Sequence, residues 1–249
     1  MKNPLALATL FCALTLTFTS VAQAATLKVA STPTGSPFTF LNTKTNSVEG
    51  VMVDIVNAVS KKAGFEVQIE PMPFASLIGS LTSKRVDLIS AAMFITPARQ
   101  QVVDFSSPVY SYGEGVVAPN SDTTAYTSFE EMKGKKVGVQ VGTAFVEPLQ
   151  KSGLFSEVKL YETTADLMRD ANAGRIDIGV LDYPIAAYAI NQKVFPALHL
   201  VTTYKATMPN NIGIAGRKGD TELMGKINTA LAELKADGSI DAILKKWGL

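Results

Sequence analysis

The sequence predicts an α/β fold in two similar lobes, each a mostly parallel sheet flanked by helices. Strand-like and helix-like segments alternate along the chain, which favours parallel sheets covered by helices. Residues 86–92 form a nearly unbroken apolar run, as expected of a strand buried on both faces. The segment KRVDLIS at 84–90 is echoed by GRIDIGV at 174–180. The echo predicts a repeated plan, although a match this short also arises by chance.

Residues 1–24 predict a secretory signal peptide. Lys2 gives a positive start, Leu5 to Val21 carries no charge, and Ala22-Gln23-Ala24 is a small-residue cleavage site. A membrane anchor is the alternative, but no basic cluster follows to stop transfer. The only cysteine, Cys12, lies in this segment. We therefore expect a periplasmic protein whose mature chain has no disulfide and no thiolate metal ligand.

Composition argues for a packed globular protein without a nucleic-acid partner. The 249 residues allow one large domain or two small ones. The chain has 23 basic and 22 acidic residues. Loss of Lys2 with the signal leaves the two signs balanced. Without an excess of charge there is no long-range attraction to nucleic acid or to an anionic membrane.

Periodicity places the elements of the first half. The segment Gly50–Gly64 has apolar residues at helical spacing, lysines in its last turn and a glycine at its end. A turn-rich loop at 31–37 follows the first strand. The expected elements in order are a strand at Thr26–Ala30, a helix at Gly50–Gly64, a strand at Phe65–Glu70, a helix at Phe74–Ser83 and a strand at Val86–Ala92.

The second half repeats this plan and adds helices at the C-terminus. A break at Asp237-Gly238 divides the last helical stretch into two. The expected elements are strands at Lys136–Gln140, Glu157–Tyr161 and Arg175–Val180, a helix at Thr164–Ala173, and the broken helical pair at Thr221–Trp247.

Four loops follow predicted strands and would face a cleft between the lobes. In open α/β sheets, ligands sit outside the carboxyl ends of the strands. The loops are Ser31–Pro37, Ala92–Arg99, Gln140–Ala144 and Leu181–Pro184.

Arg99 is the first candidate binding residue in these loops. Pro97 suits the first turn of a helix and Thr96 suits its N-cap, so Arg99 falls one turn inside, just after a buried strand. A guanidinium matches a carboxylate through two parallel hydrogen bonds. The alternative is a salt bridge with Asp104.

Asp182 and the Gly142-Thr143-Ala144 loop are the next candidates. Asp182 ends a strand and is suited to an ammonium group, or alternatively to capping a helix before Pro184. The glycine loop would offer N–H groups to an anion, or would be an ordinary turn. Together with Arg99 these groups predict a site for a zwitterion. Four aromatic residues would form its apolar walls, or part of the core: Phe74, Phe94, Tyr110 and Tyr183.

Several motifs together resemble the family 3 solute-binding proteins, the periplasmic amino-acid receptors of ABC importers. The resemblance covers the mature chain and rests on GVMVDIVNAVSKKAG, RVDLISAAMFITPARQQVVDFS, MKGKKVGVQVGT, GRIDIGVLDYP and LKKWG. It implies a type II periplasmic-binding-protein fold, with two lobes joined by two crossover segments. Lobe 1 would comprise 25–110 with 212–249, and lobe 2 would comprise 111–211.

The resemblance also implies roles for site residues. Arg99 would grip the ligand α-carboxylate with help from Thr143 and Ala144, and Asp182 would hold the α-ammonium. Phe74 would pack on the ligand side chain. The implied partners are a small zwitterionic ligand and the membrane permease of an ABC importer, with no cofactor and a monomeric receptor.

The chain departs from the family pattern in its pocket. Thr32 stands where many receptors have an acid, Gly35 stands near where they have an aromatic, and Ala92-Met93-Phe94 replaces Gly-x-Thr. Gln140 occupies a position where relatives place polar groups. These departures indicate a less polar pocket. The candidate ligands left open are an apolar or aromatic amino acid, an N-substituted or cyclic one, and a compatible solute held by aromatic faces.

Two other function classes remain open from the sequence. A periplasmic dehydratase of prephenate-like acids would need a general acid or base, for which Glu114 and Glu147 lie near the loops. His199, the only histidine, falls on an expected strand, where it is more often a plain surface or core residue. A sensor module that signals through closure is the third class. We find no metal cluster, phosphate loop or nucleophile triad in the sequence.

Overall fold

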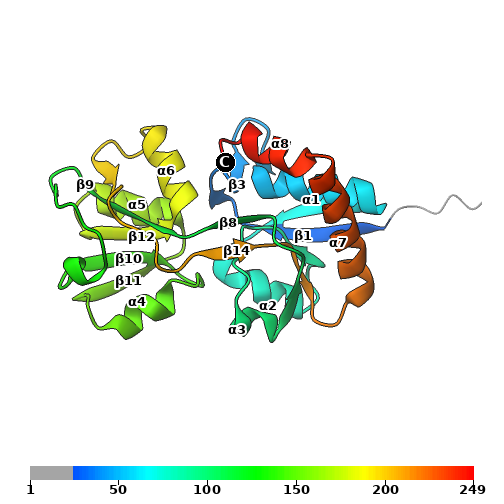
Figure 1. Ribbon diagram of the computed structural model, residues 1–249, viewed down its shortest axis with the longest axis horizontal. Coiled ribbons are helices and arrows are strands. Elements are labelled where there is room, and N and C mark those ends of the chain that lie inside the picture. The colour runs from blue at the N-terminus through cyan, green and yellow to red at the C-terminus, as the bar shows by residue number, and fades with distance from the viewer. Residues whose placement is uncertain (1–24) are drawn as a thin grey trace, which may run out of the picture.

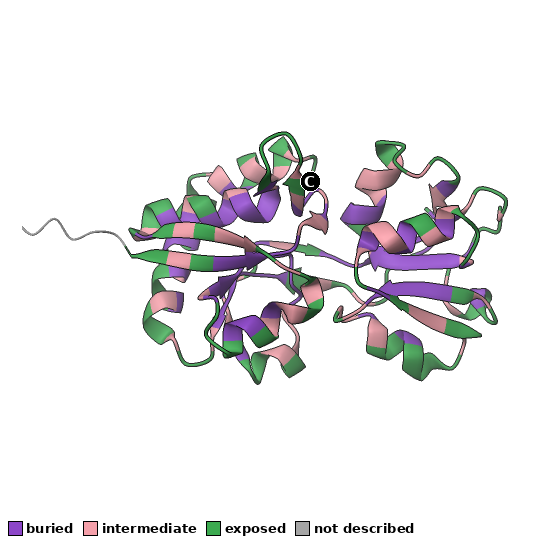
Figure 2. Ribbon diagram, turned by 180° about the vertical axis from the view of Figure 1, so that it is seen from behind, coloured by how far each residue is buried: buried purple, intermediate pink, exposed green. Residues whose placement is uncertain are grey.

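The computed structural model describes residues 25–249, and the predicted signal peptide lies outside the described residues. Two lobes stand side by side, each built on a five-stranded sheet with helices on both of its faces (Figure 1). Burial is concentrated in the central strands of both sheets (Figure 2). The two-lobed α/β prediction is confirmed, although both sheets are mixed rather than purely parallel.

The first sheet has the strand order β5-β1-β6-β15-β7. Strand β1 pairs in parallel with β5 and β6, while β15 runs antiparallel to β6 and β7. The strands are β1 (Thr26–Ser31), β5 (Glu66–Pro71), β6 (Leu88–Ile89), β7 (Val103–Phe105) and β15 (Ala215–Arg217).

Helices cover both faces of this sheet. Three helices pack together on one side: α1 (Val51–Ala63), α7 (Thr221–Ala236) and α8 (Ser239–Lys246). The other side carries a 3-10 turn (Phe74–Ser76), α2 (Leu77–Thr82) and α3 (Pro97–Gln100). A small antiparallel sheet is formed by β2 (Thr34–Gly35), β3 (Thr39–Asn42) and β4 (Ser47–Glu49).

The second sheet has the order β11-β10-β12-β9-β13. Its parallel strands are β10 (Lys136–Gln140), β11 (Glu157–Tyr161) and β12 (Ile178–Asp182), and β9 (Glu114–Pro119) runs antiparallel between β12 and β13 (Leu198–Leu200). The surrounding helices are a 3-10 turn (Glu130–Met132), α4 (Val146–Ser152), α5 (Thr164–Asn172) and α6 (Tyr183–Asn191).

Two antiparallel strands, β8 (Tyr110–Tyr112) and β14 (Asn210–Ile212), connect the lobes (Figure 1). Glu114 ties these crossing segments together just inside the second lobe. Its buried carboxylate accepts hydrogen bonds from the Tyr204 hydroxyl at 2.7 Å, the Thr207 N–H at 2.6 Å and the Met208 N–H at 3.0 Å. The two crossings are therefore held in fixed register where they enter the lobe.

The sequence echo corresponds to one structural device used twice. Asp87 and Asp177 each accept a hydrogen bond at 2.8 Å from a backbone N–H in a parallel strand of their own sheet, donated by Lys28 in β1 and by Lys136 in β10. The turns before them pass through the left-handed region, at Lys84 with φ of 61° and at Gly174 with φ of 68°. In both lobes the carboxylate fixes where the strand after the helix enters the sheet.

Most element predictions are confirmed, and the errors lie at ends. Strands β10 and β11 have the predicted bounds, and the C-terminal helices break at the predicted site. The strand expected at 86–92 is only Leu88–Ile89, because Ala92 turns the chain at φ of 53°. The strand expected at 175–180 begins and ends later, at Ile178–Asp182.

Two further findings concern the described part of the chain. Within residues 25–249 no helix has the length and apolarity that crossing a bilayer requires. The same residues contain no grouping of three or more His, Cys, Asp or Glu side chains able to hold a metal ion.

Candidate functional site

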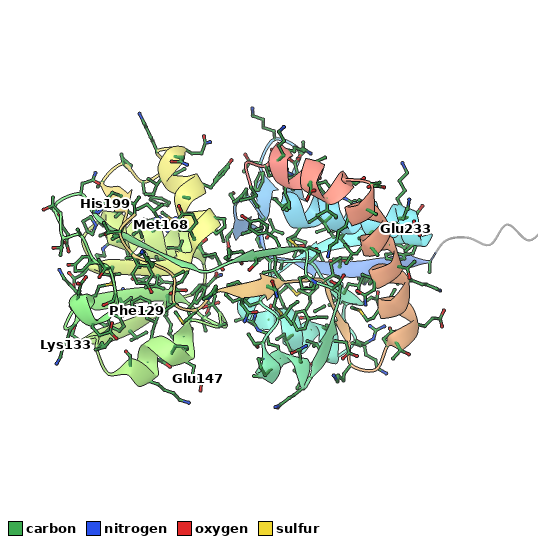
Figure 3. The ribbon with its side chains drawn as sticks, in the orientation of Figure 1. Phe129, Lys133, Glu147, Met168, His199 and Glu233 are labelled. Atoms are coloured by element: carbon green, nitrogen blue, oxygen red, sulfur yellow. The ribbon has the colours of Figure 1, made fainter. Side chains whose placement is uncertain are left out.

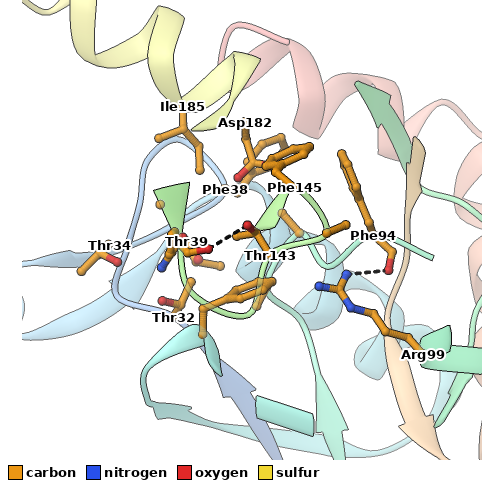
Figure 4. Close-up of a pocket in the computed structure, with 16 residues that line it drawn as sticks. Thr32, Thr34, Phe38, Thr39, Phe94, Arg99, Thr143, Phe145, Asp182 and Ile185 are labelled. Carbon is orange, nitrogen blue, oxygen red and sulfur yellow. Dashed lines mark hydrogen bonds between the residues drawn. The ribbon is translucent and has the colours of Figure 1, made fainter. Parts of the chain in front are cut away.

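A cavity lies between the lobes, and its walls come from both (Figure 4). It has an empty volume of about 430 Å³, counting the part open to solvent. The first lobe supplies Thr32, Thr34, Gly35, Phe38, Thr39, Phe74, Ala91, Ala92, Phe94 and Arg99, and the second supplies Gln140, Thr143, Ala144, Phe145, Asp182 and Ile185. Each predicted loop contributes, so the carboxyl ends of the strands converge as expected.

Nine of the ten predicted site residues line this cavity, and Met93 does not. Met93 is 1% exposed and packs in a hydrophobic cluster with Leu77 and Leu81. Its neighbours Ala92 and Phe94 line the cavity instead.

Arg99 reaches the cavity from the short helix α3. Thr96 caps this helix by accepting the Arg99 N–H at 3.3 Å, as predicted. The guanidinium donates from Nη1 to the Phe94 carbonyl at 2.8 Å and from Nη2 to the Gly142 carbonyl at 2.9 Å. It also lies 5.7 Å from the centre of the Phe74 ring. The second bond joins the lobes.

The alternative salt bridge between Arg99 and Asp104 is wrong. Asp104 pairs instead with Lys218, whose Nζ lies 2.7 Å from its carboxylate. Burial lowers the pKa of Arg99, and the negative charge of Asp182 opposes that effect. A guanidinium remains charged at neutral pH under such a shift. The cavity therefore holds a permanent cation that no carboxylate of residues 25–249 neutralises by direct contact.

Asp182 stands at the end of β12, opposite in charge to Arg99. It occupies the N-cap position of α6, but its side chain accepts no capping hydrogen bond, so the alternative capping role is wrong. Burial raises the pKa of Asp182 to about 6, although the neighbouring Tyr112 hydroxyl and the Arg99 charge work in the other direction. The carboxyl is thus poised to change charge just below neutral pH.

The glycine loop approaches the first lobe closely. Gly142 has φ of 78°, and a Cβ there would lie 3.0 Å from the Ala75 Cα, so both conformation and space require glycine. The Thr143 hydroxyl donates to the Gln140 carbonyl at 2.8 Å. Within residues 25–249 the N–H of Ala144 has no hydrogen-bond partner.

Seven lining residues were not predicted as site residues, among them Ala91, which directly precedes the second predicted loop. Phe38 and Thr39 lie just past the predicted loop, Phe145 just past the glycine loop, and Ile185 in the first turn of α6. Thr34 and Gly35 lie within the predicted loop itself. In the sequence, the position of aromatic residues directly beside the predicted loops was the signal that could have identified Phe38 and Phe145.

The rings form one cluster behind the cavity. Phe94 packs edge-on against Phe145 at 5.4 Å between ring centres and against Tyr112 at 4.9 Å, and Phe38 stacks on Tyr112 at 5.1 Å. Tyr112 also donates its hydroxyl to the Ala92 carbonyl at 3.0 Å. Tyr110 and Tyr183, considered as walls from the sequence, line a separate groove near the C-terminus.

The groups considered for acid–base catalysis do not line the cavity. Glu114 is bonded within the crossing segments, as described above. Glu147 is 74% exposed and pairs with Lys151 on α4. His199 lies in β13, where it pairs with Ala118. Figure 3 shows His199 on the second lobe away from the gap between the lobes, and Glu147 at the lower end of the same lobe.

A direct bond between the lobes closes another edge of the cavity. The Thr164 hydroxyl, at the start of α5, donates to the Thr34 carbonyl at 2.7 Å. Together with the bond from Arg99 to Gly142, this contact describes a closed arrangement of the two lobes. Arg99 and Asp182 project into the cavity from opposite lobes in that arrangement (Figure 4).

Comparisons with known proteins agree on one family. Residues 27–249 match the model of the bacterial extracellular solute-binding proteins, family 3. The L-cystine-binding protein TcyJ of Escherichia coli (strain K12) is 31% identical over 228 residues, which cover 91% of this chain and 84% of that protein. The putative ABC transporter arginine-binding protein 2 of the same strain is 33% identical over 231 residues, covering 92% and 93%.

A solved structure supports the same assignment. An ancestral arginine-binding protein bound to glutamine superposes with a TM-score of 0.83 at 33% identity, covering 91% of this chain and 99% of that one. Both the sequence relationship and the shared architecture extend over nearly the whole described chain. This protein therefore belongs to the family 3 bacterial extracellular solute-binding proteins.

Proposed function

We propose that this protein is the periplasmic substrate-binding component of an ABC importer and that it binds an amino acid between its lobes. Membership of the family and the binding roles for which the relatives are named support this role. The signal-like N-terminus supports a periplasmic location. We propose that the receptor is monomeric and binds no nucleic acid, and that the lobes divide at residues 110/111 and 211/212.

One observation indicates the chemical class of the ligand. In the described residues, Arg99 and Asp182 are the only ionisable side chains that line the cavity. They have opposite charges and come from different lobes. An α-amino acid carries the complementary pair, a carboxylate and an ammonium, on one carbon atom. A zwitterion placed between them is bound through two charge-assisted contacts with no charge left over.

The proposed binding mode places the ligand α-carboxylate on Arg99, with the N–H of Ala144 and the side chain of Thr143 nearby. The guanidinium would exchange its carbonyl partners for a carboxylate, which is the stronger acceptor. The α-ammonium would lie at Asp182. Phe74 and Phe94 would flank the ligand, and Thr32, Ala92 and Gln140 would complete the walls.

Closure follows from the same geometry. A ligand that contacts Arg99 on one lobe and Asp182 on the other makes both contacts only in the closed form. It therefore shifts the equilibrium between open and closed forms by its differential affinity. The membrane permease would recognise the closed form and accept the ligand from it.

We propose further that the protein is not an enzyme. The relatives reported above are named as binding proteins. Glu114, one of the two glutamates considered for catalysis, uses its carboxylate to hold the crossing segments. Among the described residues, Asp182 is the one carboxyl that lines the cavity, and the proposed ligand ammonium would lie against it.

Replacement of Arg99 tests the proposal. Arg99→Ala removes one partner of a buried charged contact, which costs about 2–5 kcal/mol of binding free energy. We expect calorimetry with a panel of L-amino acids to show a loss of affinity of about thirtyfold or more, with the circular dichroism spectrum unchanged. Arg99→Lys keeps the charge but not the two-pronged geometry, so it should recover only part of the affinity.

Arg175→Ala is the matched control. Arg175 also forms an ion pair, with Asp170, but it is 64% exposed and lies outside the cavity. Its loss should leave binding unchanged. The proposal fails if the Arg99→Ala protein binds the same ligand as tightly as the Arg175→Ala protein does.

A further inference from the structure

Thr39 carries an unpartnered hydroxyl at the edge of the cavity. It opens strand β3 and is 1% exposed. Among the fully buried side-chain nitrogen and oxygen atoms of residues 25–249, Thr39 Oγ1 is the one with no hydrogen-bond partner. Two other threonine hydroxyls at this site do have partners: Thr143 donates to Gln140 and Thr164 donates to Thr34. Among the fully buried side-chain oxygens of the described residues, the missing partner is therefore particular to Thr39.

A buried hydroxyl without a partner loses its hydration and gains nothing in return. Native proteins contain few such groups, and those that persist often belong to binding sites. Thr39 itself lines the cavity. An orphan hydroxyl in the wall of a binding cavity is satisfied when the bound molecule brings the missing hydrogen-bonding group.

The position of Thr39 indicates which part of the ligand it would meet. Figure 4 shows Thr39 and Arg99 on opposite sides of the cavity. Thr39 lies close to Gly35, where an added Cβ would be 3.8 Å from Thr39 Oγ1 and 3.3 Å from Ile185 Cδ1. With the α-carboxylate at Arg99 and the α-ammonium at Asp182, the ligand side chain is the part that points toward Thr39.

The polar groups near this end of the cavity are uncharged. Gln140 is 5% exposed and donates its amide nitrogen to the Glu162 carbonyl at 3.0 Å, which fixes the side chain and leaves its amide oxygen as an acceptor. The side-chain oxygens that the first-lobe loop at 31–37 adds to the cavity wall belong to Thr32 and Thr34. A charged ligand side chain would find no opposite charge here, and an unpaired buried charge is strongly disfavoured.

We propose that Thr39 is a specificity-determining residue whose hydroxyl hydrogen-bonds to the side chain of the bound amino acid. The site then selects an uncharged side chain that carries an amide or a hydroxyl. This inference rests on the proposed function and narrows its ligand class. It also departs from the apolar or aromatic amino acid that was one of the candidates left open by the sequence, because the orphan hydroxyl penalises a ligand that cannot satisfy it.

Calorimetry with matched ligands tests this inference. The panel is asparagine, glutamine, serine and threonine against methionine and leucine, with lysine and glutamate as charged members. We expect the tightest ligand to be one of the first four and to bind at least about tenfold more tightly than methionine or leucine. Thr39→Val keeps the shape of the side chain and removes the hydroxyl. It should reduce the ratio of affinities between the polar and the apolar ligands at least about fivefold. Thr39→Ser should preserve it.

Thermal unfolding of the ligand-free protein gives a second readout. Because the Thr39 hydroxyl has no partner, Thr39→Val should leave the melting temperature unchanged or raise it. Ser106→Ala is the control, since the buried Ser106 hydroxyl donates to the Ser107 carbonyl and accepts the Ile214 N–H, each at 3.0 Å. That variant should melt at a lower temperature. A lower melting temperature for Thr39→Val would show that the hydroxyl is bonded in the free protein and would overturn the inference.

The binding outcomes separate this inference from the proposed function. If Arg99→Ala abolishes binding but Thr39→Val keeps the full discrimination, the receptor role stands and the role of Thr39 is wrong. A charged or apolar tightest ligand also overturns the inference and leaves the receptor role in place. If the wild-type protein binds no amino acid of the panel, the proposed function fails and the inference fails with it.

Discussion

At the scale of single residues, the cavity is defined by two charges that do not neutralise each other by contact. Arg99 donates to two backbone carbonyls, and Asp182 has no ion pair in the described residues. Enclosure by protein raises the pKa of Asp182 to about 6. An ammonium group beside it would favour the ionised form and lower that pKa again. Ligand binding and proton release are therefore coupled.

This coupling predicts the pH dependence of affinity. Below a pH of about 6 the free carboxyl is protonated and must lose its proton before it can hold an ammonium. Affinity should therefore be highest above that pH and should fall as the pH drops, by roughly tenfold between pH 7 and pH 5. Calorimetry at pH 5, 6, 7 and 8 measures it. Asp182→Asn should bind more weakly and show no such slope. If the affinity of the wild type does not change with pH, Asp182 does not contact the ligand ammonium.

Sequence reasoning identified both charged residues and seven of the uncharged lining residues, but it missed others, including Thr39. Arg99 and Asp182 can be recognised in the sequence because a charged residue close to the end of a buried strand is unusual unless it has a partner or a function. Thr39 does not, because its role depends on the register of the β2-β3 hairpin, which brings it beside Gly35. Met93 was included because Ala92-Met93-Phe94 stands in place of the Gly-x-Thr of the family pattern, but its side chain packs in the core while Ala92 and Phe94 line the cavity.

At the scale of elements, local patterns located strands and helices better than their ends. Strand β10 and strand β11 follow from alternation alone. The strand after α2 was overestimated because an apolar run does not show that Ala92 adopts a left-handed conformation. The repeated aspartates, Asp87 and Asp177, show why the echo exists, since each fastens the backbone N–H of a lysine in a parallel strand of its own lobe.

The first turn of α5 supplies a latch between the lobes. The bond from the Thr164 hydroxyl to the Thr34 carbonyl exists only when the lobes are together. Thr164→Val should lose about 1 kcal/mol of closure, the usual net contribution of one hydrogen bond. Because closure is coupled to binding, we expect ligand affinity to fall about fivefold, mostly through faster dissociation in stopped-flow measurements.

Thr203→Val is the control for the latch. The Thr203 hydroxyl donates to the Tyr126 carbonyl at the same 2.7 Å, but both residues belong to segments of the second lobe. This variant should lose some stability and keep its affinity. Equal affinity losses in the two variants would mean that the Thr164 bond has no special part in closure.

At the scale of the whole molecule, two lobes on separate sheets meet over a cavity that neither completes alone. The sequence predicted this arrangement because the plan of alternating strands and helices occurs twice. It could not predict how tightly the lobes close, because closure depends on contacts between residues more than a hundred positions apart, such as Thr34 with Thr164. The strands β8 and β14 and the bonds of Glu114 hold the lobes in register.

Identification of the small molecule that co-purifies with the protein tests the central claim most directly. Tight binding between closing lobes leaves ligand on the purified protein. Mass spectrometry of small molecules released by denaturation should identify an α-amino acid with an uncharged polar side chain from the wild type. The Arg99→Ala protein, purified in parallel, should release none. Release of a molecule that lacks an α-carboxylate, or of the same molecule from both proteins, would contradict the account.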